Sequence, residues 1–164
     1  MIKIFVTGGT FDKDYDEKNG ELYFKETHMN EILNLGRSKV DVSIETLMML
    51  DSLDMKNSDR KLIIEKCTKS KESHIVITHG TDTMTDTARE LGLKKLNKTI
   101  VLTGAMIPYK FGTSDGLFNI ASALAYVQTL TRGVYVAMNG RVFTYDKVIK
   151  NKDTAIFEEI IWAT

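Results

Sequence analysis

Threonines beside glycines recur at three points of this sequence, a pattern that suits a nucleophile next to hydrogen-bond donors. The segments are Thr7-Gly8-Gly9-Thr10, Thr78-His79-Gly80-Thr81-Asp82-Thr83 and Thr103-Gly104-Ala105-Met106. A glycine lets the backbone approach a substrate closely and leaves its N–H free to stabilise a developing oxyanion. A threonine hydroxyl attacks a carbonyl carbon only when a base lies within hydrogen-bond reach. The segments therefore predict nucleophilic chemistry, with a tyrosine, a lysine or a histidine as the base.

The histidines and the glycine pair also have simpler interpretations. His79 stands at the end of a predicted strand, where we expect it to bond to the backbone and shape the turn instead of acting as the base. His28 and His74 are expected at the surface. Gly8-Gly9 leads into a charged segment and not into the helix that a G-x-G-x-x-G dinucleotide site requires, so a nucleotide cofactor is not expected.

The elements that must position these residues alternate between strand and helix. Short β-branched apolar runs are typical of buried parallel strands, and the longer amphipathic stretches between them are typical of covering helices. We therefore predict an α/β domain, a parallel-sheet, three-layer Rossmann-like fold with helices on both faces. The predicted strands are 2–6, 40–47, 74–78, 99–102 and 133–138, and the predicted helices are 57–70, 84–93 and 117–130.

The carboxyl ends of the predicted strands are where a ligand is expected, because open parallel sheets bind ligands beyond those ends. The three threonine segments each follow a strand, and Asp51-Ser52-Leu53-Asp54-Met55 follows another. All four segments meet at one edge of the sheet if the strands are parallel. The charged stretch 12–20, which ends in the turn pair Asn19-Gly20, is expected to be a mobile loop beside this edge.

Composition excludes several classes of function. The 22 basic and 22 acidic residues cancel, so the chain as a whole has no electrostatic attraction for nucleic acid or an anionic membrane. No apolar run approaches the roughly 18 residues of a membrane span, and the apolar start is too short for a signal peptide. The single cysteine, Cys67, can form neither an internal disulfide nor a cysteine metal pair, so we expect an inert thiol in a cytoplasmic protein.

The combination and order of these segments resemble the asparaginase/glutaminase family, the bacterial-type L-asparaginases. Ile77 to Met84, reading ITHGTDTM, is the most specific match, and Val6 to Phe11 is nearly as specific. The resemblance extends from Ile2 to about Phe157 and corresponds to the larger, N-terminal domain of the family. It implies an amidohydrolase that releases ammonia from the side-chain amide of asparagine through a threonine-bound acyl intermediate, without a metal or cofactor.

The resemblance also implies catalytic roles. Thr10 matches the nucleophile of the first motif, and the segment after it matches a lid that carries an activating tyrosine. Tyr23 is favoured for that tyrosine, with Tyr15 as the alternative. Thr81 and Asp82 match the second threonine and its acid. The family's lysine corresponds to Lys150, with Lys147 as the second choice, and a solvated surface lysine is the simpler interpretation of Lys150.

Substrate-binding roles follow from the same comparison. Ser52 matches the serine that holds the α-carboxylate of the substrate, and Asp82 is expected also to receive the α-ammonium group. The backbone near Thr10 and Thr81 is expected to supply oxyanion donors, so that Gly9, Gly80 and Ala105 line the substrate. Leu53 takes a substrate-binding position where the family usually has a polar residue, and an apolar side chain there points to altered specificity or weakened binding.

Length is the second departure from the family, whose members are about twice as long. In the family an acid from the C-terminal domain of a neighbouring subunit completes the site, and we expect that domain to be absent here, with 1–164 as one asparaginase N-terminal-like domain. The apolar end from Phe157 to Thr164 suggests either a docking surface or a segment that folds back onto its own sheet, and we expect a homodimer or homotetramer. Two hypotheses follow: a minimal amidohydrolase for a small amide, or an amino-acid-binding module or subunit with little or no activity. A truncated product without a function of its own also fits the length.

Overall fold

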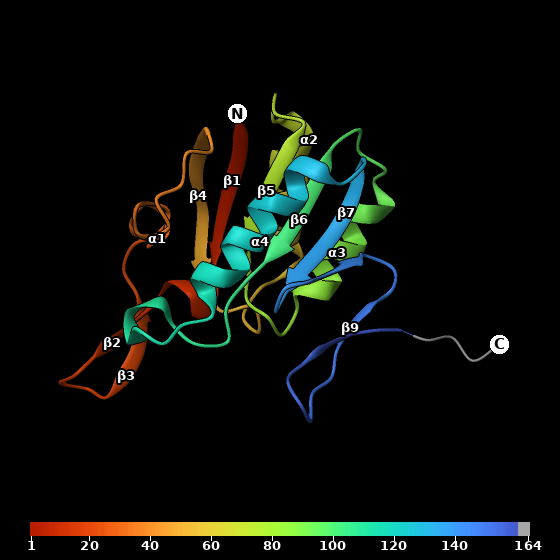
Figure 1. Cartoon of the computed structure of the whole chain (residues 1–164). Helices are drawn as coiled ribbons and strands as arrows, with labels where there is room; N and C mark the ends of the chain where they lie inside the picture. The colour runs from red at the N-terminus through yellow and green to blue at the C-terminus, as the bar shows by residue number, and fades with distance from the viewer. Residues whose placement is uncertain (161–164) are drawn as a thin grey trace.

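Six strands form the central sheet, in the order β4-β1-β5-β6-β7-β8 (Figure 1). This computed structural model describes residues 1–160 of the chain. The first five strands in that order run parallel, and β8 runs antiparallel to β7. The strands of this sheet are β1 Ile2–Gly8, β4 Val42–Leu50, β5 His74–Thr78, β6 Thr99–Thr103, β7 Gly133–Met138 and β8 Arg141–Thr144.

Two layers of helix cover the sheet. Side chains of α1 (Met29–Leu35) and α4 (Gly116–Thr129) share one buried cluster with Ile4 and Val101 of the sheet. Side chains of α2 (Asn57–Lys69) and α3 (Met84–Leu93) share a second cluster with Ile77 of the sheet. Because β1, β5 and β6 contribute residues to both clusters, they are apolar along nearly their whole length, as parallel strands buried on two faces must be.

Helical spacing explains how α2 and α3 pack against the sheet. Met84, Ala88 and Leu91 lie on one face of α3 and are fully buried, and Ile63 and Cys67 do the same on α2. Burial raises the pKa of the Cys67 thiol to about 12, so the thiol stays protonated and unreactive at neutral pH.

Two hairpins project from the carboxyl edge of the sheet, and Figure 1 shows them on opposite sides of it. The first joins β2 (Lys13–Asp16) to β3 (Glu21–Phe24) after the short 3₁₀ turn η1 (Thr10–Asp12). The second joins β9 (Val148–Lys150) to β10 (Phe157–Glu159). A second 3₁₀ turn, η2 (Tyr109–Phe111), lies in the loop after β6 and contacts β2.

The predicted elements agree closely with these elements, and the differences lie in the additions. All five predicted strands and three predicted helices are present, with bounds shifted by at most three residues. The expected loop over 12–20 is wrong in its conformation, because Lys13–Asp16 pairs with Glu21–Phe24 and Asn19-Gly20 forms part of the turn between them. The antiparallel strand β8 and the short helix α1 were not predicted.

The expected apolar docking end is only partly described: Phe157 packs into the core, and 161–164 lie outside the described residues.

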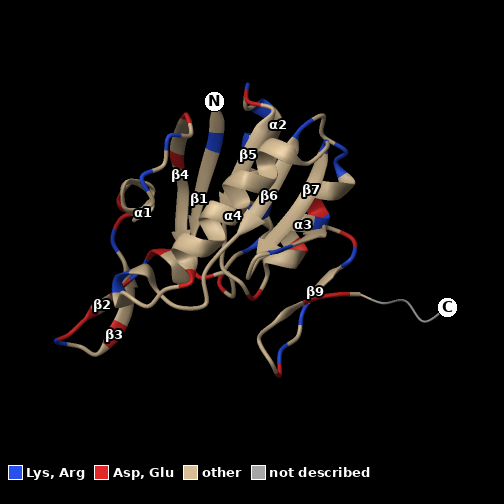
Figure 2. Cartoon of the chain, in the orientation of Figure 1, with Lys and Arg blue, Asp and Glu red and all other residues tan. Residues whose placement is uncertain are grey.

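Charge is spread evenly over the fold. Figure 2 shows basic and acidic residues interspersed over the loops and helix ends. Within residues 1–160, no helix combines the length and the apolar character needed to cross a membrane.

Gly92 gives a test of how β9 is held in place. A methyl group at this position in α3 would overlap the ring of Tyr145, which lies in the turn that leads into β9. Alanine normally stabilises a helix relative to glycine, but here we expect Gly92→Ala to lower the free energy of unfolding by about 1–3 kcal/mol through overpacking. Urea denaturation measures the change, with Leu93→Ala on the exposed side of the same helix as control. Equal or higher stability of Gly92→Ala would contradict this packing.

Candidate active site

Glycines bring three loops of the carboxyl edge into direct backbone contact. A Cβ on Gly9 would lie 2.5 Å from the Cα and the nitrogen of Gly80, and a Cβ on Gly80 would lie 2.6 Å from the Cβ of Ser52. Gly9 also has a φ of 77°, a conformation that favours glycine. Any side chain at Gly9 or Gly80 would push the loops apart. The predicted substrate-binding residues Gly9, Gly80 and Ser52 therefore pack directly against one another. We call these three residues the glycine surface.

Threonine hydroxyls join the same loops and strands. Thr7 Oγ1 donates to the carbonyl of Thr78 at 2.8 Å, which links the end of β1 to the end of β5. Thr83 Oγ1 donates to the carbonyl of Ser52 at 2.9 Å. These two hydroxyls satisfy backbone acceptors and are structural.

Lys150 completes a hydrogen-bonded group with Thr81 and Asp82. Its Nζ lies 2.8 Å from Thr81 Oγ1 and 2.6 Å from Asp82 Oδ1. The Lys150 side chain is 12% exposed and that of Asp82 is 46% exposed, so the ion pair faces solvent on the carboxylate side only. The simpler interpretation of Lys150 as a solvated surface lysine is therefore wrong. Lys147, the second choice, is exposed.

The contact between Gly9 and Gly80 relates Thr10 to the group formed by Thr81, Asp82 and Lys150. It is half-buried at the start of η1 and directly follows Gly9, just as Thr81 directly follows Gly80. The close approach of the two glycines therefore sets the two threonines on neighbouring loops.

The two candidate tyrosines project from opposite faces of the first hairpin. Tyr15 pairs with Leu22, and Tyr23 pairs with Asp14, so alternation along the strands separates the two rings. Lys13 shares the face of Tyr15, and its Nζ contacts Asp51, the residue before Ser52. Asp14 shares the face of Tyr23 and contacts the His28 ring at 3.3 Å. Both tyrosines are exposed, and Tyr15 packs edge-on against Phe111.

His79 is structural, as its position predicted. Its buried ring contacts the Gly80 carbonyl through Nδ1 and Thr87 Oγ1 through Nε2, each at 2.8 Å. The carbonyl can only accept, which assigns the proton to Nδ1 and leaves Nε2 to accept from Thr87. Burial lowers the pKa of His79 to about 4, so the ring is neutral and both nitrogens are engaged. The ring holds the turn at Gly80 and is not free to act as a base.

The remaining predicted binding residues differ in their exposure. Ser52 is buried against Gly80, whereas the Leu53 side chain is 71% exposed at the mouth of the site. The side chain of Ala105 is buried in the core, so any contact of this residue with a ligand falls to its backbone.

Asp115 and Asn119 support the loop after β6, a role that the sequence did not indicate. The Asp115 carboxylate accepts the backbone N–H groups of Met106 and Ile107 at 3.0 Å, and Asn119 donates to the Gly104 carbonyl at 2.9 Å. These hydrogen bonds connect residues 9 and 15 positions apart, so no local sequence pattern indicated them.

Asp12 fastens the base of the first hairpin. Its buried carboxylate accepts from Thr27 Oγ1 at 2.9 Å and from the His28 N–H at 3.1 Å. These hydrogen bonds join the segment before β2 to the segment after β3. Burial raises the pKa of Asp12 to about 6, against the opposing effect of these hydrogen bonds. His28 is buried between Asp14 and the Tyr109 ring, so its expected place at the surface is wrong. An isolated histidine in a polar sequence gave no indication of this burial.

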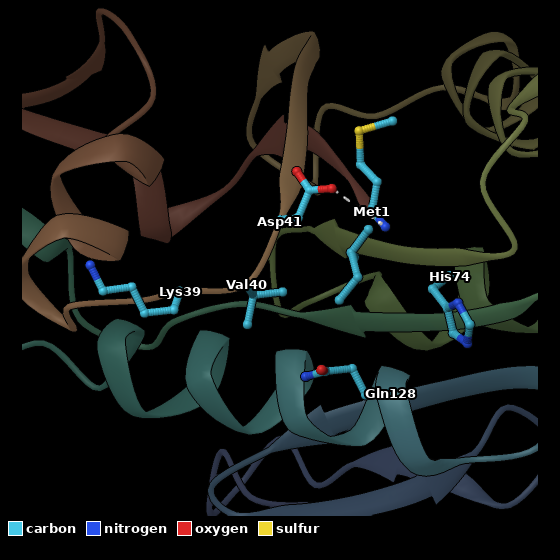
Figure 3. Close-up of a pocket in the computed structure, with 7 residues that line it drawn as sticks. Met1, Lys39, Val40, Asp41, His74 and Gln128 are labelled. Carbon is cyan, nitrogen blue, oxygen red and sulfur yellow. Dashed lines mark ion pairs between the residues drawn. The ribbon is translucent and has the colours of Figure 1, made fainter.

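Of two further hollows, one lies away from these groups and the other reaches them. Figure 3 shows one lined by Met1, Lys39, Val40, Asp41, His74 and Gln128, which lies at the opposite, amino edge of the sheet. Another, of about 900 Å³, lies between α3 and the second hairpin and begins at Leu53, Asp82 and Lys150. Among the described residues, no group of three or more His, Cys, Asp and Glu side chains is placed to hold a metal ion.

This chain is similar to known proteins over nearly its whole length. The family model described as "Asparaginase, N-terminal" matches residues 1–158. The chain belongs to the asparaginase family. L-asparaginase 2 of Escherichia coli is 33% identical over 172 residues, which cover 97% of this chain and 49% of that relative. The structure of the thermostable L-asparaginase from Thermococcus kodakarensis superposes with a TM-score of 0.82 at 29% identity, over 99% of this chain and 52% of that one.

A second kind of asparaginase-family relative is also present. A glutamyl-tRNA(Gln) amidotransferase subunit of Methanococcus vannielii is 32% identical over 149 residues, covering 86% of this chain and 34% of that relative. The chain therefore spans about half, or less, of the length of the relatives described here.

Burial of Asp12 predicts a pH-dependent stability. The folded protein retains a proton on Asp12 up to about pH 6, whereas the unfolded chain releases it near the ordinary value of 3.8. The Asp12 contribution to the free energy of unfolding therefore falls as pH rises from 3.8 to 6, by on the order of 3 kcal/mol in total. Asp12→Asn keeps an acceptor for Thr27 and should remove this fall, as measured by denaturation at pH 4 and pH 7.

Asp16 provides the control on the same hairpin. It is exposed, and hydrogen bonds from the Lys18 N–H and the Asn19 side chain hold its pKa below the ordinary value, so Asp16→Asn should not reduce the fall. An unchanged pH dependence in Asp12→Asn would contradict the burial of an ionisable carboxyl there.

Proposed function

We propose that this protein is an amidohydrolase that hydrolyses a side-chain amide, such as that of L-asparagine, to the acid and ammonia. The observation that carries the proposal is the contact of Lys150 with both Thr81 and Asp82 beside the glycine surface that bears Thr10. Membership of the asparaginase family supports the same reaction. The proposal needs no metal or cofactor, because threonine, lysine and carboxylate groups supply the nucleophile and the proton transfers.

The reaction would proceed through an acyl-enzyme ester. Thr10 Oγ1 attacks the amide carbon and gives up its proton, and backbone N–H groups near Thr10 and Thr81 stabilise the oxyanion. Collapse of the tetrahedral intermediate breaks the C–N bond, and ammonia leaves with the transferred proton. Water then attacks the ester, releasing the acid and restoring the hydroxyl of Thr10. The Thr81–Lys150–Asp82 group is the proposed relay for these protons.

The hairpin geometry favours Tyr15 over Tyr23 as the activating tyrosine. Lys13 shares the face of Tyr15 and reaches Asp51 at the edge that bears Ser52, whereas the face of Tyr23 is directed to His28 and α1. We therefore assign the role to Tyr15 and revise the preference for Tyr23 drawn from the sequence.

Leu53 favours a second candidate function, an amino-acid-binding module or subunit of low activity. Its exposed apolar side chain offers no hydrogen bond to a charged amino-acid head, and Asp82 is already paired with Lys150. Likeness to a component of an amidotransferase agrees with a subunit role. In either case we propose a homodimer or homotetramer, because symmetric homo-oligomers are the commonest assemblies of soluble proteins, and light scattering of the purified protein tests the assembly.

The cytoplasm is our proposed location. The buried thiol of Cys67, the sole cysteine, suits a reducing compartment. Fractionation of the native cells tests the location directly.

Threonine substitution tests the reaction. We expect purified protein to release ammonia from asparagine, glutamine or a related small amide. Thr10→Ala should lower kcat by about a thousandfold or more and Thr81→Ala by about a hundredfold or more. Thr68→Ala, on the exposed face of α2, is the control for the same change away from the site. Absence of ammonia above the Thr10→Ala background would reject the enzyme, and calorimetric binding of the same amino acids would then support the binding module.

Removal of single hydroxyls tests the tyrosine assignment. Tyr15→Phe should lower kcat by about a hundredfold, because it removes a proton-transfer group and keeps the ring that packs against Phe111. Tyr23→Phe makes the same change on the other face of the hairpin and should leave kcat within about twofold of wild type. The opposite pattern would assign the role to Tyr23.

A further inference from the structure

An ion pair between Lys13 and Asp51 joins the first hairpin to the substrate side of the edge. Lys13 Nζ lies 2.5 Å from Asp51 Oδ2, and the two side chains are 18% and 29% exposed. The residues lie 38 positions apart in the sequence. The pair therefore adds a side-chain link between the hairpin and the Ser52 loop, beyond the backbone hydrogen bond from Gly9 to Leu50 that joins the ends of β1 and β4.

On the hairpin side, Lys13 holds both strands. Its ammonium group lies 5.7 Å from the centre of the Phe24 ring, on the residue that pairs with Lys13 across the hairpin. Other attachments of this hairpin lead elsewhere: Asp14 contacts His28 at the start of α1, and Tyr15 packs against Phe111 of η2. Lys13 is thus the hairpin side chain whose ion pair reaches the Ser52 loop.

On the other side, Asp51 shapes the loop that it anchors. Its Oδ1 accepts the backbone N–H of Leu53 at 3.0 Å while Oδ2 receives Lys13, so the carboxylate spans Ser52. Ser52 is in turn pressed against Gly80, the residue before Thr81. A shift of Asp51 would therefore disturb both the hairpin and the loop that packs beside the threonine.

Hydrogen bonding favours the charged form of Asp51 in this pair. Although partial burial opposes ionisation, hydrogen bonds from Lys13 and the Leu53 N–H hold the pKa of Asp51 below its ordinary value. A partly buried pair is less screened by salt than an exposed one.

We propose that Lys13 and Asp51 are positioning residues, a latch that sets the Tyr15 face of the hairpin against the Ser52 loop. The proposal rests on the proposed amide hydrolysis for its catalytic consequence. Its mechanical content is independent of activity: breaking the pair loosens the hairpin, and restoring a pair of reversed sign tightens it again.

Four variants separate the latch from general electrostatics. Lys13→Met and Asp51→Asn each remove one charge, Lys13→Arg keeps the pair, and the double variant Lys13→Asp with Asp51→Lys reverses it. Lys3→Met is the matched control, because Lys3 pairs with Glu45 at similar burial, 14% and 34% exposed, away from the hairpin. Thermal melting confirms that each variant folds.

Hydrogen exchange read by mass spectrometry gives the first readout. Peptides covering 13–24 should exchange about fivefold faster in Lys13→Met and Asp51→Asn, near the wild-type rate in Lys13→Arg and the reversed pair, and at the wild-type rate in Lys3→Met. Unchanged exchange in Lys13→Met would overturn the latch. Equal loosening by Lys3→Met, or failure of both Lys13→Arg and the reversed pair to retain protection, would overturn it as well.

Kinetics gives the second readout on the same samples. Lys13→Met leaves Asp51 and its hydrogen bond to Leu53 in place, so it should lower kcat about tenfold with KM changed by less than about twofold, because the misplaced Tyr15 acts in the reaction step. A rise in KM alone would overturn the positioning role. If the wild type releases no ammonia, the proposed function fails, and hydrogen exchange alone decides the latch.

Discussion

The contact between the backbones of Gly9 and Gly80 is the constraint on which the candidate site depends. Two parallel strands place the loops that follow them side by side, but ordinary side chains would keep those loops several ångströms apart. Glycine at both positions allows backbone to meet backbone, and Ser52 then closes on the other side of Gly80. The threonines that follow the two glycines are brought together by this contact, which needs no hydrogen bond between them.

Lys150 shows a second constraint, the satisfaction of a partly buried charge. A lysine that is 12% exposed requires a counter-charge, and Asp82 supplies it, with Thr81 as a further acceptor. The hairpin that carries Lys150 is held by Phe157, which packs into the core, and by Tyr145, which occupies the space over Gly92. Core packing far along the chain thus fixes the position of one ammonium group at the edge of the sheet.

Sequence reasoning recovered the parallel sheet and its helices because buried apolar runs and helical spacing are local patterns. It also placed Thr81, Asp82 and Lys150 together, although that depended on a family resemblance and not on spacing. It missed β8, because the antiparallel return after β7 is only four residues long, and it described the first hairpin as a loop because β2 is dominated by charged residues. The burial of His28 and the pairing of Lys13 with Asp51 arise from tertiary contacts that no local pattern encodes.

The carboxylates at this edge already have partners within the chain, and this limits how a substrate could bind. Asp82 is paired with Lys150, Asp51 with Lys13, and the Asp115 carboxylate accepts backbone N–H groups. An amino-acid head group would therefore have to compete with an existing ion pair, share it, or meet a group from a second subunit. The exposed side chain of Leu53 offers only apolar contact at a position where a charged head group requires a hydrogen-bond partner. The polar contacts left for a substrate come mainly from backbone N–H groups and the two threonine hydroxyls, which recognise an amide carbonyl better than they recognise a charged head group. For the proposed amide hydrolysis, the edge is thus better matched to the amide group than to the rest of an amino acid, and specificity for the remainder of the proposed substrate would depend on the Leu53 side of the site.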